Sequence, residues 1–210
     1  MLARIVAISH ASGSGGESIG RSVADRLGFR YVDEEIISLV AEKEGLDPAI
    51  VADAERRQSL LARILRSFSD AQASAAAGAG AYWDPERELT KPEVYGLIID
   101  AIRQTAQRGD VVIVAHAASI PLAGTSGLLR ILITASGETR VQRLAKDTRR
   151  ETAETARLLR RSDEGRADYF QRFYAIEREL PTHYDLVINT DMLTVEDAID
   201  IVVFAARGRA

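Results

Sequence analysis

Residues 5–20 read Ile5-Val6-Ala7-Ile8-Ser9-His10-Ala11-Ser12-Gly13-Ser14-Gly15-Gly16-Glu17-Ser18-Ile19-Gly20. The apolar first half predicts a buried parallel strand, and the glycine cluster behind it predicts a tight loop that leads into a helix. The glycines can adopt a positive φ and let a ligand approach the backbone, while the helix N-terminus offers unpaired N–H groups and a positive dipole end. The stretch is therefore predicted to bind an anion.

Composition sets the first limits on structure and function. The chain has 210 residues, of which 46% are hydrophobic, and it contains no cysteine. This length supports one domain with a full core, and the lack of cysteine excludes disulfides and thiolate chemistry. The net charge of −4 argues against a nucleic-acid partner. We see no signal-peptide pattern and no apolar run long enough to cross a bilayer, so we expect a cytoplasmic protein without a membrane partner.

Strand and helix patterns alternate along the rest of the chain. Further strands are predicted at 29–32, 111–114, 129–134 and 186–189, and helices at 16–27, 90–107, 137–146, 151–161, 163–177 and 195–206. This alternation predicts an α/β fold with a parallel five-stranded sheet, helices on both faces, and ligands at the carboxyl ends of the strands.

The segment between the second and third predicted strands, residues 34–92, is too long for a simple crossover. We interpret it as an inserted helical lobe of a single domain, with one helix at 34–43, another at 56–72 and a loop of low complexity at 71–80. The helix at 56–72 carries an apolar face that packs either on the body or on a second copy of the chain. A homodimer is therefore one hypothesis.

Two phosphate-loop patterns compete for the glycine cluster. The dinucleotide pattern G-x-G-x-x-G, counted from Gly13, fails because Ser18 stands at its third glycine. The mononucleotide P-loop G-x-x-x-x-G-K-[ST] aligns with Gly16 and Ser18, but it has Ala11 in place of the first glycine and Glu17 in place of the lysine. The loop is thus a P-loop without its basic residue.

Several separated blocks resemble the cytidylate kinase-like family, a group of P-loop proteins related to the bacterial CMP kinases. The blocks follow one another over most of the chain, at residues 8–20, 27–37, 111–118, 163–170 and 183–190. The resemblance implies a three-layer P-loop kinase fold, ATP and Mg²⁺ as cofactors, and phosphoryl transfer to a nucleoside monophosphate such as CMP or to a related small acceptor. It also implies that residues 34–92 bind the acceptor and that residues from about 147 to 172 form a lid.

The resemblance assigns the donor phosphates to the glycine loop. The residues expected to hold them are Ser12, Gly13, Ser14, Gly15, Gly16, Glu17 and Ser18. Ser18 is in addition the expected ligand of Mg²⁺. The family carries arginine where this chain has Glu17, so the charge at that position is reversed.

The expected catalytic residues of the lid are Arg157, Arg160, Arg161, Asp163 and Arg166, of which the arginines are expected to cancel phosphate charge. Asp163 and Arg166 keep the Asp-x-x-Arg spacing of the family. Arginine suits this role because its planar fork matches phosphate oxygens. The alternative for most of these residues is a solvated helix face paired with nearby glutamates.

Two residues are expected to face the acceptor. Asp33 ends the second predicted strand, where it either caps the following helix or faces the ligand crevice. His116 follows the third strand, where the family tends to have arginine, and it either packs against its neighbours or binds phosphate. Of the other histidines, His10 is expected to pack beneath the loop and His183 to be structural.

The choice between two functional hypotheses depends on Glu17. Phosphoryl transfer depends on positioning and on cancelling the charge of the transferred group, and a carboxylate in the loop repels phosphate. Glu17 either points to solvent from the first helical turn or helps to hold Mg²⁺. The chain is accordingly either a nucleoside monophosphate kinase-like enzyme, whose partners are a nucleotide and a small acceptor, or a nucleotide-binding sensor or scaffold that has lost catalysis.

Overall fold

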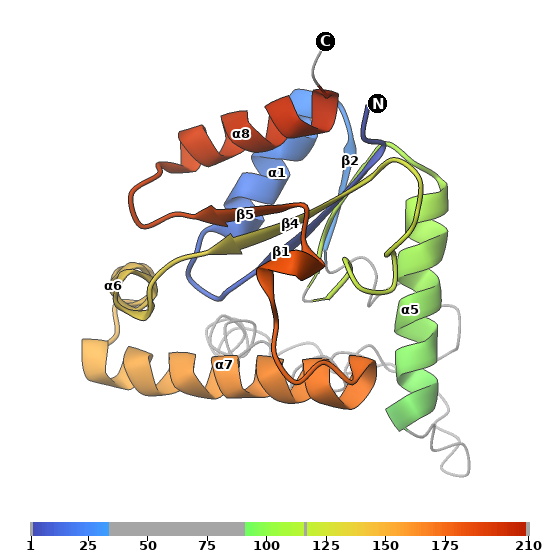
Figure 1. Cartoon of the computed structure of the whole chain (residues 1–210). Helices are drawn as coiled ribbons and strands as arrows, with labels where there is room; N and C mark the ends of the chain where they lie inside the picture. Colours follow the sequence, from blue (N-terminus) through green and yellow to red (C-terminus); the bar gives the residue numbers. More distant parts are fainter. Residues whose placement is uncertain (1, 34–90, 116, 209–210) are drawn as a thin grey trace, which may run out of the picture.

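The computed structural model describes residues 2–33, 91–115 and 117–208 (Figure 1). Within them, parallel strands form one sheet in the order β2-β3-β1-β4-β5. The strands are β1 (Ile5–His10), β2 (Arg30–Val32), β3 (Val111–Val114), β4 (Leu128–Thr134) and β5 (Leu186–Asn189). The predicted parallel five-stranded sheet is confirmed. The predicted lobe, residues 34–92, lies outside the described residues except for its last two positions. The predicted helices and loop of this lobe, and also His116, lie outside the described residues.

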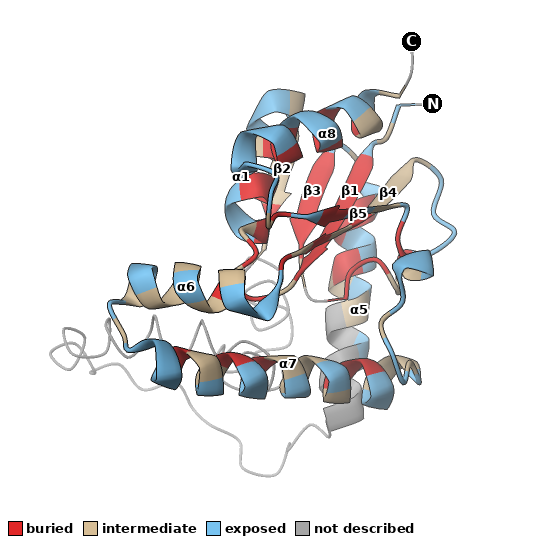
Figure 2. Ribbon diagram, turned by 60° about the vertical axis from the view of Figure 1, so that its left-hand side comes forward, coloured by how far each residue is buried: buried red, intermediate tan, exposed pale blue. Residues whose placement is uncertain are grey.

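Helices cover both faces of this sheet, as Figures 1 and 2 show. They are α1 (Gly16–Leu27), α5 (Lys91–Gln107), α6 (Gly137–Thr148), α7 (Thr152–Tyr174) and α8 (Val195–Arg207), with a short 3₁₀ turn η1 (Pro181–His183). Because side chains alternate along a strand, Val6 and Ile8 pack with α1 and α8, whereas Ile5 and Ala7 pack with residues of α5 and α7. The domain therefore has three layers.

The central strand β1 places the glycine loop in the middle of one sheet edge. All its residues are buried, and it pairs with β3 on one side and with β4 on the other. His10, its last residue, lies opposite Ile133 of β4. The carboxyl edge of a parallel sheet beside its central strands is where α/β proteins bind ligands.

Residues 151–177 differ from the prediction of two helices at 151–161 and 163–177. The structure has one continuous helix, α7, through Ser162. Ser162 stands inside this helix and is buried, with its hydroxyl 3.0 Å from the hydroxyl of Ser12 in the glycine loop. The helix ends at Tyr174, where Ala175 adopts a left-handed conformation with φ of 53°.

Several predicted helix ends are confirmed. Gly28 follows α1 in the left-handed conformation, with φ of 69°. Thr194 caps α8, because its hydroxyl accepts a hydrogen bond from the Asp197 N–H at 3.1 Å. Among the helices of the described ranges, none combines the length and apolarity that crossing a membrane requires.

Candidate functional site

The glycine loop has the backbone geometry of an anion-binding turn. Gly13 and Gly15 have φ of 80° and 86°, and Gly15 directly precedes the first residue of α1. The Ser14 N–H donates to the Ala11 carbonyl at 3.0 Å, and the Ser18 hydroxyl donates to the Gly15 carbonyl at 2.9 Å. The first-turn N–H groups of α1 and the positive end of its dipole meet at this loop, which suits phosphate.

Helix α6 packs directly on the loop. A Cβ atom on Gly13 would lie 2.9 Å from the Arg140 carbonyl oxygen and 2.9 Å from Leu144 Cγ, so only glycine fits here. The buried Arg140 guanidinium donates to the Ser12 carbonyl at 3.4 Å and forms two bonds to Asp163, at 2.9 and 2.8 Å. Asp163 is thus placed beside the loop, paired with an arginine that the sequence analysis did not assign to the site.

A second arginine of α6 supports the loop from the side of β5. Arg143 donates to the Thr190 hydroxyl at 2.9 Å and to the Thr190 carbonyl at 2.6 Å. The buried Thr190 hydroxyl in turn donates to the Ser14 carbonyl, at 3.0 Å. Arg140 and Arg143 are three residues apart, which puts both on one side of a helix, and this spacing is the signal by which the pair could have been found.

Arg166 and Glu179 form a largely buried ion pair. The Arg166 guanidinium donates two hydrogen bonds to Glu179, at 2.9 and 2.7 Å, and a third to the His10 carbonyl at 3.3 Å. The Tyr184 hydroxyl donates to the same carboxylate. Burial lowers the pKa of Arg166, but the hydrogen bonds and charge of Glu179 outweigh it and raise that pKa. Burial next to Glu179 also raises the pKa of Tyr184 to about 12.

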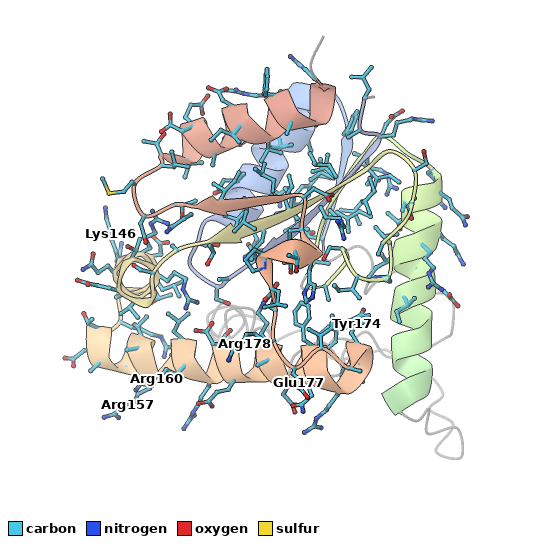
Figure 3. All side chains as sticks on the ribbon, viewed as in Figure 1. Lys146, Arg157, Arg160, Tyr174, Glu177 and Arg178 are labelled. Carbon is cyan, nitrogen blue, oxygen red and sulfur yellow. The ribbon has the colours of Figure 1, made fainter. Side chains whose placement is uncertain are left out.

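The other predicted lid arginines lie elsewhere on α7. Arg157, Arg160 and Arg161 are exposed, whereas Leu159 and Ser162 of the same helix are buried. Figure 3 shows Arg157 and Arg160 on the side of α7 that is turned away from the sheet. The structure therefore brings Asp163 and Arg166 to the loop and leaves these three arginines exposed on α7.

Glu17 and His10 lie beside each other at the start of α1. The Glu17 side chain is 65% exposed, and its Oε1 atom lies 3.9 Å from Nε2 of His10. The His10 side chain is buried, as predicted. Burial, and next the charge of Arg166, lower the pKa of His10 to about 4. At neutral pH the loop thus contains a neutral imidazole and a carboxylate.

Asp33 lies just beyond the carboxyl end of β2, near the amino half of α1. Its carboxylate is 3.6 Å from the Arg21 guanidinium, which stacks over the Tyr31 ring at 4.2 Å from the ring centroid. Burial raises the pKa of Tyr31, and a hydrogen bond to Asp33 raises it further. Asp33 and the glycine loop therefore lie along the same edge of the sheet, on either side of the start of α1.

No group of three or more histidine or acidic side chains within the described ranges is placed to hold a metal ion. Magnesium in nucleotide sites is commonly held by one or two protein oxygens together with phosphate oxygens and water. The loop presents two oxygen ligands for a Mg²⁺ ion held jointly with phosphate and water, namely the Ser18 hydroxyl and the exposed Glu17 carboxylate.

Comparison with solved structures supports the fold. A protein from Eubacterium ventriosum, described as uncharacterized, superposes with a TM-score of 0.68 at 15% identity, over 98% of this chain and 99% of that one. A gluconokinase from Sinorhizobium meliloti superposes with a TM-score of 0.50 at 12% identity, over 95% of this chain and 91% of that one. At such identities the likeness concerns the fold alone, which is the P-loop kinase fold.

Sequence comparison gives the family. A cytidylate kinase from Pyrobaculum neutrophilum is 30% identical over 112 residues, which are 53% of this chain and 60% of that protein. The match thus spans less than two thirds of that relative. The profile of the cytidylate kinase-like family matches residues 5–192, from the first residue of β1 to the segment that precedes α8. The chain belongs to the cytidylate kinase-like family.

Proposed function

We propose that the protein binds ATP with Mg²⁺ and transfers a phosphoryl group to a nucleoside monophosphate, CMP or a close analogue, or to a related small acceptor. The observation that carries this proposal is the loop between β1 and α1, with left-handed Gly13 and Gly15 at the edge of the central strand. Backbone N–H groups bind phosphate there without a basic side chain. The family membership points to the same reaction.

The described residues fit the phosphates of ATP and the shared coordination of Mg²⁺. The loop from Ser12 to Ser18 would hold the donor phosphates through its backbone, and the Ser18 hydroxyl would supply a protein ligand to Mg²⁺. The bound ion would neutralise charge on the transferred phosphoryl group. Asp33 and His116 are the proposed acceptor residues, and His116 lies outside the described residues.

The chain's own contribution to the reaction is positioning. Arg140 and Thr190 donate to loop carbonyls and Arg143 holds Thr190, so the loop keeps its shape before a ligand arrives. Arg157, Arg160 and Arg161 remain proposed lid residues. They are exposed on α7, and closure of α7 over the loop would bring them toward bound phosphate.

A second candidate function is nucleotide binding without catalysis, as in a sensor or scaffold. Residues 11–20 contain no lysine or arginine, and the one charged side chain among them, Glu17, is negative. Binding through backbone N–H groups tolerates this charge better than phosphoryl transfer does, because the transition state depends on charge cancellation.

The two functions are separated by measuring binding and turnover on the same folded protein. Calorimetry with ATP, ADP and CMP gives binding, and a coupled ADP-release assay over a panel of nucleoside monophosphates gives turnover. Turnover with one of them establishes the kinase. Binding without turnover supports the sensor or scaffold, and the absence of any nucleotide binding rejects both.

Glu17 is tested by the graded variants Glu17→Gln and Glu17→Lys. A matched control is Asp25→Lys, which makes the same charge change at an exposed position of α1 beyond its first turn. If Glu17 only repels phosphate, ATP binding tightens when the carboxylate is replaced by the neutral amide and tightens again when it is replaced by lysine, while the control leaves it unchanged. A loss of turnover in Glu17→Gln instead assigns the carboxylate a role in the reaction.

A further inference from the structure

His10 and Gly16 occupy one shared space at the base of the loop. A Cβ atom built on Gly16 would lie 2.2 Å from His10 Cβ and 2.4 Å from His10 Cγ. These atoms cannot move far, because they lie close to the backbone of the buried strand β1. The imidazole therefore fills the volume into which a side chain on the first residue of α1 would extend.

This contact links two defined positions of the P-loop pattern. Counted from Ala11, as in the sequence analysis, the pattern G-x-x-x-x-G-K-[ST] has Glu17 at its lysine. Counted from His10 instead, the pattern has its second glycine at Gly15 and its lysine at Gly16, and Glu17 stands where the pattern has Ser or Thr. The structure supports this register, because Gly15 is the left-handed residue before the helix and Gly16 is the first helical residue. The lysine position thus has no side chain, and a histidine from the first position of the pattern occupies its place.

The ring is oriented with one nitrogen toward the start of α1. Nδ1 is buried, whereas Nε2 lies 3.9 Å from the carboxylate of the exposed Glu17. The backbone of His10 is fixed as well, since Arg166 donates to its carbonyl at 3.3 Å. The groups near the ring are the Glu17 carboxylate on α1, the Arg166 guanidinium on α7, which is paired with Glu179, and the Ala11 backbone, which forms a hydrogen bond with the ring.

We propose that His10 replaces the loop lysine, with its Nε2 donating a hydrogen bond to a phosphate group bound at the N-terminus of α1. This inference rests on the proposed function, because it requires that the loop binds phosphate. A neutral imidazole provides one donor and no charge, so it aids phosphate binding less than a lysine does. With His10 in this place, only glycine fits at position 16.

The first test exchanges the two side chains. His10→Gly removes the donor and opens the space, Gly16→Lys adds a cation without room for it, and the double variant His10→Gly/Gly16→Lys adds the cation with room. Calorimetry with ATP and Mg²⁺ is expected to show that His10→Gly binds ATP about tenfold more weakly than the wild type, or weaker still, since a hydrogen bond to a charged group is lost. The double variant is expected to regain that affinity, whereas Gly16→Lys alone is expected to lose binding or folding.

The second test keeps the side-chain volume at position 10 nearly constant, so it remains valid if His10→Gly does not fold. His10→Gln retains a side-chain donor and His10→Leu has none, so His10→Gln is expected to bind ATP more tightly than His10→Leu, with folding of both checked by circular dichroism. In the wild type, the ¹⁵N resonance of His10 Nε2 is expected to shift when ATP is added.

Specific results would overturn the inference. Equal ATP affinity in the wild type, His10→Gln and His10→Leu would reject the role of His10 and leave the proposed function standing. A double variant that binds no better than His10→Gly would reject the exchange with lysine. A wild-type protein that binds no ATP would reject both the inference and the proposed function.

Discussion

Replacing Glu179 by alanine is expected to destabilise the protein strongly. The change removes two hydrogen bonds from Arg166 and one from Tyr184, and it leaves the guanidinium with the His10 carbonyl as its hydrogen-bond partner among the described residues. Arg166 is only 11% exposed, so water cannot replace the lost carboxylate. Breaking a buried ion pair in this way costs about 3 to 5 kcal/mol. That cost is a large share of the roughly 5 to 15 kcal/mol that stabilises a typical domain.

The measurement is urea unfolding followed by circular dichroism, arranged as a double-mutant cycle. Arg166→Met and the pair Arg166→Met/Glu179→Ala complete the cycle. Because the double variant buries no unpaired charge, it is expected to be more stable than Glu179→Ala, with a coupling energy of about 2 kcal/mol. Asp168→Ala is the matched control, since it breaks the exposed pair with Arg172 on the same helix and should cost less than about 1 kcal/mol.

The refuting result is an additive cycle. If the loss of unfolding free energy in the double variant equals the sum of the losses in the two single variants, the two side chains do not stabilise each other. A Glu179→Ala variant no less stable than Asp168→Ala would also contradict the reasoning, because it would mean that the Arg166 charge is solvated without its partner.

Three further predictions concern the loop and its supports. His10 takes up a proton below pH 6.5 in the unfolded chain but only below about 4 in the folded protein. As the pH is lowered from 6.5 to 4, the free energy of unfolding should therefore fall by up to about 3 kcal/mol. Urea unfolding at several pH values should show a smaller fall for His10→Gln than for the wild type or for the control His183→Gln. Gly28→Ala should cost about 1 kcal/mol, because its φ of 69° is unfavourable but nothing lies near its Cβ position; Gly13→Ala should cost clearly more, since α6 blocks its Cβ, and equal thermal midpoints would contradict this. Thr190→Val should destabilise by about 1 to 3 kcal/mol in thermal unfolding, because it removes the hydroxyl that joins Arg143 to the loop; a variant as stable as the wild type would show that these groups find other partners.

The parts of the fold that the sequence predicts correctly depend on local signals. The apolar run of β1, the glycines behind it and the capping residues Gly28 and Thr194 act within a few residues of themselves, so their patterns indicate where the elements begin and end. The contact of Ser162 in α7 with Ser12 joins residues that are 150 positions apart in the chain. No local pattern predicts that contact.

The candidate site shows the same limit. The glycines and the fold are predictable from spacing, but the placement of Arg166 against Glu179 depends on how α7 packs beneath the loop. The direct contact of His10 with Gly16 is likewise a matter of three-dimensional geometry, although the two residues are only six apart. The exposure of Arg157, Arg160 and Arg161 agrees with the alternative that the sequence offered for them, a solvated helix face.

The supports of the glycine loop have a consequence for the order in which the protein becomes active during synthesis. The loop comes from the first twenty residues, yet Arg140, Ser162 and Thr190, which hold it in place, are translated more than a hundred residues later. A nascent chain that carries β1 and α1 alone therefore has the glycines without the surroundings that shape them. Since a ligand stabilises only the state that binds it, nucleotide should favour the finished domain over every partly synthesised form.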